Sequence, residues 1–236
     1  MISRIKAYYW EARYRLLKRK WDKGRNSSVI DCDVLMFHHI SDAHVDIDPT
    51  CQSTVAEFKA ILDSRINNGY TYIGIAQIED IINNHKSGKH AVVTFDDVPH
   101  NFITTAYPIL KEYNIPFTLF ITTSFLTDPE YLSESDIVTL SHDRLCTIGA
   151  HTVTHPMLRK SEDPFSEMLQ SKQTLEKILG KPVKYLAYPF GRQSSISHKV
   201  QRLAQKAGFS LAFSTIQTSI NDRSARHPFF LPCVIK

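Results

Sequence analysis

Two histidines four residues apart are the clearest candidate metal ligands in this sequence. The segment reads His151-Thr-Val-Thr-His155 and is followed by Pro156. Neutral imidazole is a common ligand of Zn²⁺ and of similar first-row cations, and two imidazoles at this spacing can meet one cation. Because a residue before proline avoids the helical region, we expect a loop here. By itself, the pair is better explained as two structural histidines.

Two adjacent carboxylates, Asp96 and Asp97, directly follow an apolar and β-branched run at residues 91–95. Two carboxylates this close repel each other, which raises one pKa unless a cation neutralises them. The conflict is resolved if one carboxylate binds a metal and the other remains as a base. The alternative is an exposed turn or helix start, where Asp is common. A His/His/Asp set leaves positions open on a metal, which is typical of a catalytic site that hydrolyses an amide or an ester.

These side chains must be brought together by the elements that carry them. Apolar runs predict strands at residues 34–37, 70–75, 91–95, 117–121, 147–150, 185–188 and 209–213. Helical patterns between them predict helices at residues 55–67, 78–83, 102–113, 133–145, 165–179 and 197–206. Strands that alternate with helices indicate a parallel sheet with crossover helices. We therefore predict an α/β fold, a single distorted (β/α) barrel of about seven parallel strands, with an open doubly wound sheet as the alternative.

In such a barrel, the loops that follow the strands gather at one face, where active sites are built. The polar residues that follow the predicted strands are His38 and His39, Asp96 and Asp97, residues 122–124, His151, and residues 189–191. We therefore expect these residues to lie close together.

The first 28 residues differ from the rest of the chain in charge. They hold nine Lys or Arg and two acidic residues, whereas the rest holds slightly more acidic than basic residues. We predict a basic helix and linker over residues 1–28 and a barrel domain over residues 29–236. The helix carries two stripes, one of Ile5, Tyr9, Ala12 and Leu16 and an aromatic one of Trp10, Tyr14, Leu17 and Trp21.

One hypothesis is that the first stripe packs on the barrel and the aromatic stripe contacts an anionic membrane or a partner protein through residues 1–23. The alternative is a helix that only packs on its own domain and leaves a solvated basic face.

The composition excludes several classes of protein. The 236 residues are 42% hydrophobic and 22% charged, which excludes a wholly disordered chain and a disulfide-stapled miniprotein. No uncharged apolar run is long enough to span a membrane and residues 1–20 do not read as a signal peptide, so we expect a cytoplasmic protein, peripheral at the inner membrane face if the basic helix binds there. The four cysteines form no C-x-x-C pair, which argues against a thiolate zinc site. Because the positive charge is confined to the N-terminal segment, no nucleic-acid partner is expected.

Three motifs in order resemble those of the polysaccharide deacetylase family, metal-dependent hydrolases that remove acetyl groups from sugars. They are Thr94-Phe-Asp-Asp97, Gly149-Ala-His-Thr-Val-Thr-His155 and Leu186-Ala-Tyr-Pro-Phe-Gly191. The resemblance implies a distorted β/α barrel and one divalent metal, with Zn²⁺ first and Co²⁺ or Ni²⁺ as alternatives. It implies Asp96 as the general base and Asp97, His151 and His155 as the metal ligands. The backbone N–H of Phe190 would stabilise the developing oxyanion.

The sequence departs from the family pattern in three places. Val98 stands where a glycine is usual, Ala187 stands where an arginine often orients the base, and a late Leu-x-His that would supply the general acid is missing. Arg192 is a candidate to replace the arginine.

A circularly permuted branch of the family, the exopolysaccharide deacetylases, has the equivalent histidine after the first strand, which implies His38 as the general acid. Because only alternate side chains of a strand face one side, His38 and His39 should not share this role. The residues expected around the substrate are His39, Tyr188, Pro189, Gly191 and Arg192.

The resemblance implies hydrolysis of an N-acetylated sugar in a poly- or oligosaccharide or in a lipid-linked glycan precursor. Two alternatives remain open. A non-catalytic carbohydrate-binding relative of the barrel is favoured by Val98 and Ala187. A lipid-linked or nucleotide-linked sugar at the inner membrane face is favoured by the basic, aromatic N-terminal helix.

Overall fold

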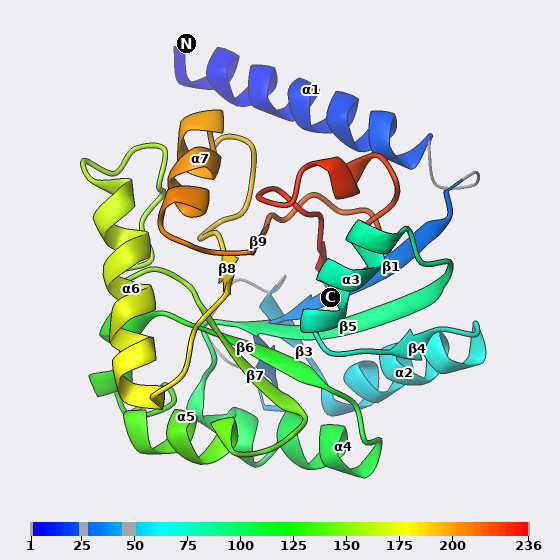
Figure 1. Cartoon of the computed structure of the whole chain (residues 1–236), viewed down its shortest axis with the longest axis vertical. Helices are drawn as coiled ribbons and strands as arrows, with labels where there is room; N and C mark the ends of the chain where they lie inside the picture. The colour runs from blue at the N-terminus through cyan, green and yellow to red at the C-terminus, as the bar shows by residue number, and fades with distance from the viewer. Residues whose placement is uncertain (1, 24–27, 44–50, 236) are drawn as a thin grey trace.

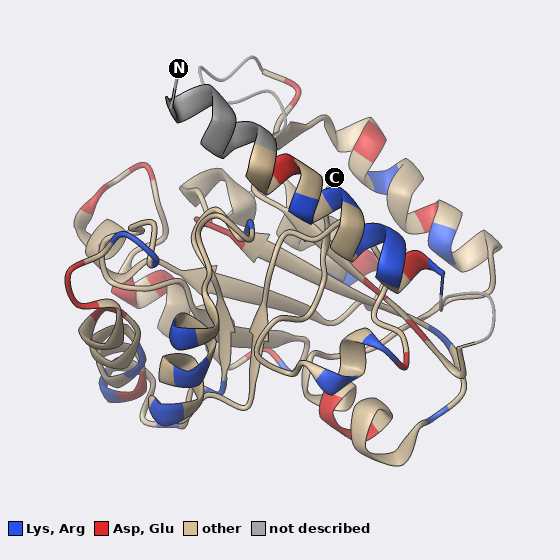
Figure 2. Cartoon of the chain, turned by 90° about the horizontal axis from the view of Figure 1, so that it is seen from above, with Lys and Arg blue, Asp and Glu red and all other residues tan. Residues whose placement is uncertain are grey.

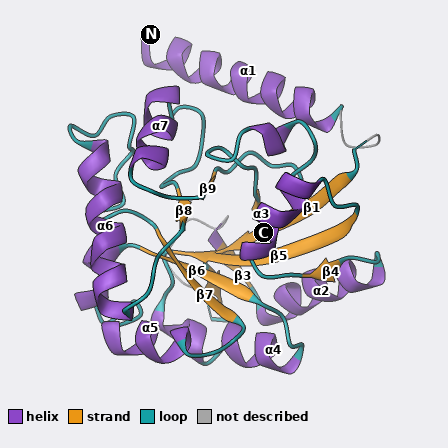
Figure 3. Ribbon diagram, in the orientation of Figure 1, coloured by secondary structure: helices purple, strands orange, loops and turns teal. Residues whose placement is uncertain are grey.

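The computed structural model describes residues 2–23, 28–43 and 51–235, and the side chains of residues 9–23, 28–43 and 51–234. Within these ranges, a parallel sheet forms the centre of the molecule and helices cover it (Figure 1, Figure 3). Its strands are β1 (Ile30–Phe37), β4 (Thr71–Tyr72), β5 (Gly88–Asp96), β6 (Phe117–Ile121), β7 (Cys146–Ala150), β8 (Tyr185–Ala187), β9 (Leu211–Phe213) and β10 (Val234–Ile235).

The strand order is β10-β1-β5-β6-β7-β8-β9, with β4 beside the start of β5. From β1 to β9 this order follows the chain, whereas a doubly wound sheet reverses direction at a switch point. The sheet also curls until the C-terminal segment contacts both of its ends, because Leu231 bridges to Phe213 of β9 and β10 pairs with β1. The predicted α/β class with a parallel sheet is therefore confirmed. The curled sheet is consistent with the predicted distorted (β/α) barrel and excludes the doubly wound alternative.

The register of the central strands aligns their carboxyl ends. Asp96 of β5 lies opposite Phe120 of β6, and Ile121 lies opposite Ala150 of β7. The next residue along each of these three strands is therefore placed at one edge of the sheet. Parallel strands deliver the segments that follow them to the same face in this way.

The helices that connect the strands are α2 (Val55–Asn67), α3 (Ala76–Asn84), α4 (Ala106–Glu112), α5 (Glu134–Ser141), α6 (Pro164–Leu179) and α7 (His198–Lys206). Short 3-10 turns form at η3 (His100–Ile103), η4 (Thr123–Thr127) and η5 (Ser224–Arg226). A separate two-stranded pair joins β2 (His39–Ile40) to β3 (Gln52–Ser53).

The predicted helix at residues 102–113 is divided between η3 and α4. The hydroxyls of Thr104 and Thr105 both donate to the carbonyl oxygen of Asn101, at 3.1 and 2.8 Å. Such local side-chain bonds compete with the helical backbone pattern and interrupt it. The predicted helix at residues 133–145 likewise ends early, at Ser141, although Ser133 and Asp136 form the capping box that starts it.

The core is dense in aromatic rings between the sheet and its helices. Phe37 of β1 packs edge-on against Phe58 of α2, with ring centroids 4.9 Å apart, and Phe95 of β5 does the same against Phe102. All four side chains are at most 2% exposed. Burial of each such ring stabilises the fold by roughly 1.5–3 kcal/mol, so this layer fixes the strands that carry the site.

Helix α1 (Ile2–Asp22) lies across one side of the barrel, over α7 and the C-terminal segment (Figure 1, Figure 2). The hypothesis that its aromatic stripe faces outward is wrong. Trp21 is 2% exposed and lies 6.2 Å from the ring of Phe230, and Tyr14 and Leu17 also pack against the core. In contrast, Tyr9 is 52% exposed and Leu16 is 67% exposed. The larger aromatic rings bury more apolar area on the barrel, which explains the orientation.

The side chain of Ile5 and residues 24–27 of the predicted linker lie outside the described residues. Contact of residues 1–23 with a membrane or a partner protein stays a prediction. Among the described helices, none has the length and apolar character that a membrane span requires.

Candidate active site

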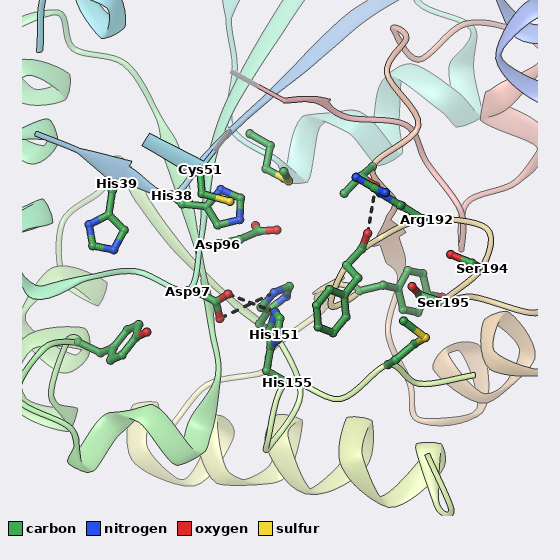
Figure 4. Close-up of a pocket in the computed structure, with 16 residues that line it drawn as sticks. His38, His39, Cys51, Asp96, Asp97, His151, His155, Arg192, Ser194 and Ser195 are labelled. Carbon is green, nitrogen blue, oxygen red and sulfur yellow. Dashed lines mark hydrogen bonds and ion pairs between the residues drawn. The ribbon is translucent and has the colours of Figure 1, made fainter. Parts of the chain in front are cut away.

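Asp97, His151 and His155 converge at the carboxyl ends of the central strands. Asp97 follows β5, His151 follows β7, and His155 lies in the loop after it. One ligand atom from each lies within 4.8 Å of the other two. The Nε2 atom of His155 is 3.2 Å from Asp97 Oδ2, and the Nε2 atom of His151 is 3.9 Å from Asp97 Oδ1 (Figure 4). Two imidazole nitrogens and a carboxylate at this spacing fit a divalent cation.

Asp97 is held in place by its backbone and by a threonine. Its φ of +48° is in the left-handed region, which aspartate tolerates better than most residues. The hydroxyl of Thr122, at the end of β6, donates to Asp97 Oδ1 at 2.9 Å. Burial opposes ionisation of Asp97, but His151, His155 and Thr122 outweigh it and hold the pKa of the carboxyl well below its usual range. Asp97 therefore carries a negative charge at neutral pH, as a metal ligand must.

His151 is oriented by the backbone of the neighbouring strand. Its Nδ1 atom lies 2.8 Å from the carbonyl oxygen of Ala187 at the end of β8. Because a carbonyl only accepts, Nδ1 carries the proton and donates, and Nε2 keeps its lone pair toward Asp97. The side chain is 2% exposed, and this burial lowers the pKa of His151 to about 4. The imidazole is therefore neutral and ready to bind a cation at neutral pH.

The loop between the two histidines is not helical, as predicted from Pro156, and it has a defined conformation. Thr152 and His155 both have positive φ, at 71° and 55°. Glu167 of α6 holds the loop, since its carboxylate accepts the backbone N–H groups of Val153 and Thr154, each at 2.9 Å. Sequence reasoning missed Glu167, because no motif links a carboxylate on α6 to this loop.

Asp96 has the opposite environment to Asp97. It is 4% exposed, and its Oδ1 atom has no hydrogen-bond partner among the described residues. Burial, and then the neighbouring charge of Asp97, raise the pKa of Asp96 well above its usual range. The carboxyl is thus a proton acceptor of raised basicity beside the candidate ligands, which suits a general base.

A cavity of about 560 Å³ opens at these residues. Nine of the residues singled out from the sequence line it: His38, His39, Asp96, Asp97, His151, His155, Tyr188, Phe190 and Arg192. Pro189 and Gly191 do not line it. The lining residues that sequence reasoning missed are Met36, Cys51, Tyr131, Met157, Ser194, Ser195 and Thr215. No sequence motif marks these residues, and the tertiary fold alone brings them to the cavity.

His38 and His39 occupy different sides of the cavity. Both histidines line the cavity, and Figure 4 shows their rings in different parts of it. His39 begins β2, and burial lowers its pKa. The roles of the two histidines stay predictions.

The segment after β8 is shaped by Gly191. The φ of Gly191 is +51°, and a Cβ there would lie 2.6 Å from the backbone nitrogen of Thr215. The preceding Phe190 has a φ of +60° and a ring that is 51% exposed at the cavity. Tyr188 is buried and its hydroxyl donates to the carbonyl oxygen of Phe229 at 3.0 Å, so only its ring is available to a ligand.

Val98 and Ala187, which depart from the family motifs, have different consequences in the structure. The positive φ falls on Asp97 and not on Val98, whose side chain is buried in the core. Ala187 cannot supply a guanidinium group to Asp96. Among the described side chains, no ion pair joins Arg192 to Asp96. The raised pKa of Asp96 is caused by burial and by the charge of Asp97. The hypothesis that Arg192 replaces the missing arginine is therefore not supported.

Known proteins resemble this chain in sequence and in structure. A sequence model of the polysaccharide deacetylase family matches residues 83–212, more than half of the chain. A protein named YxkH from Bacillus subtilis (strain 168) is 25% identical over 186 residues, which are 77% of this chain and 63% of that protein. A poly-β-1,6-N-acetyl-D-glucosamine N-deacetylase from Staphylococcus aureus (strain MRSA252) is 30% identical over 148 residues, which are 55% of this chain and 50% of that protein.

The crystal structure of a polysaccharide deacetylase from Bacillus cereus has a TM-score of 0.76 to this chain at 27% identity. The likeness covers 87% of this chain and 64% of that one. The chain therefore spans between half and two thirds of the length of these relatives.

Proposed function

Because this chain belongs to the polysaccharide deacetylase family, we propose that it removes the acetyl group from an N-acetylated sugar by metal-dependent hydrolysis. The observation that carries the proposal is the convergence of Asp97, His151 and His155 beside the buried carboxyl of Asp96. The substrate is an N-acetylated poly- or oligosaccharide or a lipid-linked glycan precursor. The name of the Staphylococcus aureus relative supports an N-acetylglucosamine polymer.

The three ligands and the base divide the work. Asp97, His151 and His155 would hold one divalent cation, and we assign Zn²⁺ first because nitrogen and carboxylate ligands suit it, as they suit Co²⁺ and Ni²⁺. When bound, such a cation makes water more acidic and polarises a carbonyl. Asp96 takes the proton from the attacking water as the new bond to the acetyl carbon forms.

The remaining groups act on the charge that develops and on the leaving amine. The N–H of Phe190 donates to the acetyl oxygen as it gains negative charge. His38 donates a proton to the sugar nitrogen while the carbon–nitrogen bond breaks, so acetate and a free amine leave. These roles are supported by the position of His38 and Phe190 on the wall of the cavity that Asp96 and Asp97 line.

The test is acetate release from N-acetylglucosamine oligosaccharides by the wild type and by Asp96→Asn, each with and without a chelator. We expect Asp96→Asn to lower the rate by about 10²- to 10⁴-fold while the bound metal stays stoichiometric, because the base binds no cation. Chelation should stop the wild type, and added Zn²⁺ should restore it. Full activity of Asp96→Asn would refute the assignment of the base.

One observation favours a second candidate function. No cationic side chain among the described residues contacts Asp96, and such a cation often orients the base in this family. A protein that binds glycans without hydrolysing them is consistent with this. It would bind N-acetylglucosamine oligosaccharides but release no acetate with any of the three metals, and the same assay separates the two functions.

A further inference from the structure

A second cavity, of about 310 Å³, lies beside helix α1 and has no part in the proposed chemistry. Its walls come from α1, from the start of α7, from Arg159, and from the segments around Gln193 and Phe230. Figure 1 shows α1 crossing over α7 at this place. The volume is in the range of cavities that hold small ligands, roughly 300–1,000 Å³.

The walls of the second cavity are cationic. Arg13 and Arg159 line it together with His198 and His227, and none of the described lining residues is acidic. The two acidic residues of α1 are each paired with a cation elsewhere on the helix, Glu11 with Arg15 at 3.0 Å and Asp22 with Lys18 at 2.7 Å. Burial lowers the pKa of His227, and the nearby charges of Lys20, His198 and Arg226 lower it further. The second cavity therefore favours an anion.

The same walls hold two indole rings and a hydrogen-bond acceptor. Trp10 and Trp21 both line the second cavity, and the guanidinium of Arg159 lies over the ring of Trp10, 4.3 Å from its centroid. The side-chain oxygen of Gln193 is buried with no hydrogen-bond partner among the described residues. Trp10 therefore positions a cation at the cavity, and an unpartnered buried acceptor suits a hydroxyl group of a sugar.

One loop separates the two cavities. Arg192, Ser194 and Ser195 line the active-site cavity, whereas Gln193 and Ile196 line the second cavity. The backbone N–H of Arg159 donates to the carbonyl oxygen of Ser195 at 2.9 Å, so the loop is tied to the wall that carries the guanidinium. A glycan that occupied both cavities would have to cross this loop.

We propose that the second cavity binds an anionic sugar unit, one that carries a phosphate or a carboxylate, of the glycan whose acetylated unit occupies the active site. This inference rests on the proposed function for the identity of the glycan. The guanidinium groups of Arg13 and Arg159 pair with the anion, because their planar donors match phosphate and carboxylate oxygens. Trp10 holds the guanidinium of Arg159 at the cavity, and the side-chain oxygen of Gln193 accepts a hydroxyl of the sugar.

Tryptophan fluorescence tests this directly, since the chain has two tryptophans and both line the second cavity. The titrants are N-acetylglucosamine 1-phosphate, glucuronic acid and neutral N-acetylglucosamine, added to full-length protein treated with a chelator. We expect saturable changes in emission with one or both anionic sugars and at least about tenfold weaker binding of the neutral sugar. The two anionic titrants distinguish a phosphate from a carboxylate. Equal affinity for all three would overturn the proposal.

Matched variants locate the binding. Arg13→Gln and Arg159→Gln each remove one guanidinium, and each should weaken binding of the anionic sugar on the order of tenfold. Arg15→Gln and Lys160→Gln are the controls, because these exposed cations are neighbours of the same residues but do not line the second cavity. They should change the affinity by less than about twofold. Equal losses of affinity in the variants and the controls would mean that the overall positive charge, and not the second cavity, attracts the sugar, which would refute the site.

The proposed function and this inference fail separately. Asp96→Asn should keep the fluorescence response while acetate release is lost. Conversely, a wild-type protein that releases acetate but whose emission responds equally to all three sugars would keep the proposed function and overturn this inference. A response that disappears in Asp96→Asn would place the sugar in the active-site cavity and overturn the second site.

Discussion

Adjacent aspartates take on opposite properties in this protein. Asp97 has a left-handed backbone conformation, and its neighbours His151, His155 and Thr122 outweigh burial and hold its pKa low. Asp96 ends the strand among buried groups, where burial and the charge of Asp97 raise its pKa. One peptide unit therefore separates the proposed metal ligand from the proposed base, and the difference lies in the surroundings rather than in the residue type.

Thr122 provides a prediction at the scale of the residue. In Thr122→Val, Asp97 loses the hydrogen bond that orients its carboxylate. We expect the affinity for Zn²⁺ to fall by about 10- to 100-fold, because groups that orient ligands have effects of this size. Titration against a competing chelator measures the affinity.

Thr118→Val on the same strand is the matched control. The hydroxyl of Thr118 is buried without a hydrogen-bond partner among the described residues, so its removal should leave both fold and metal affinity intact. Equal affinities in the two variants would contradict the orienting role of Thr122.

The site is assembled by the ends of elements. β5, β6 and β7 end at one level of the sheet and present Asp97, Thr122 and His151 beside one another. The end of β8 adds the carbonyl oxygen of Ala187, which orients His151. The loops beyond these ends depend on positive φ values and on anchors from helices, of which Glu167 on α6 is one.

Gly191 provides a prediction at the scale of the element. Gly191→Ala must adopt positive φ with a side chain and must also displace the backbone of Thr215, 2.6 Å from the new Cβ. We expect a loss of roughly 1–3 kcal/mol from overpacking beyond the conformational cost, and a fall in acetate release because Phe190 precedes this position. Urea unfolding and acetate release are the measurements.

Gly180→Ala at the end of α6 is the control. Its φ is +64°, but nothing lies within 4 Å of the new Cβ. It should lose only the conformational part, roughly 1 kcal/mol, and keep full activity. If the two variants were equally stable and equally active, the close approach of Gly191 to Thr215 would have no consequence.

The whole molecule is completed by its two terminal segments. The C-terminal segment contacts β9 through Leu231 and β1 through β10, so it joins the ends of the curled sheet. Helix α1 then covers the neighbourhood of Phe230 with Trp21 and encloses the second cavity. The ends of the chain thus build one side of the molecule, far in sequence from the strands that carry the ligands.

Trp21 provides a prediction at the scale of the molecule. Trp21→Ala removes a 2% exposed ring from between α1 and the barrel, and we expect a loss of about 3–5 kcal/mol in the free energy of unfolding. Leu16→Ala on the same helix is the control, since Leu16 is 67% exposed and its loss should change stability by less than about 0.5 kcal/mol. Similar small effects in urea unfolding would mean that α1 does not pack as described.

The sequence by itself determined the α/β class, the order of the main strands and helices, and the candidate ligands. Helix α2 and strand β6 have the predicted bounds, because a capping box at Thr54 and a fully buried apolar run are local signals. The two histidines and one of the adjacent aspartates could be proposed together, since parallel strands bring their carboxyl ends to one face whatever the side chains between them. The resemblance to the family implied that this aspartate is Asp97.

Only the tertiary structure decided which neighbours surround those residues. The anchor Glu167, the carbonyl of Ala187, the inward orientation of the aromatic stripe on α1, and the second cavity depend on contacts between segments distant in sequence. Local sequence patterns encode where helices, strands and turns form and which face of each element is apolar. They do not encode which distant surface meets that face, because that choice is made by packing and burial over the whole molecule.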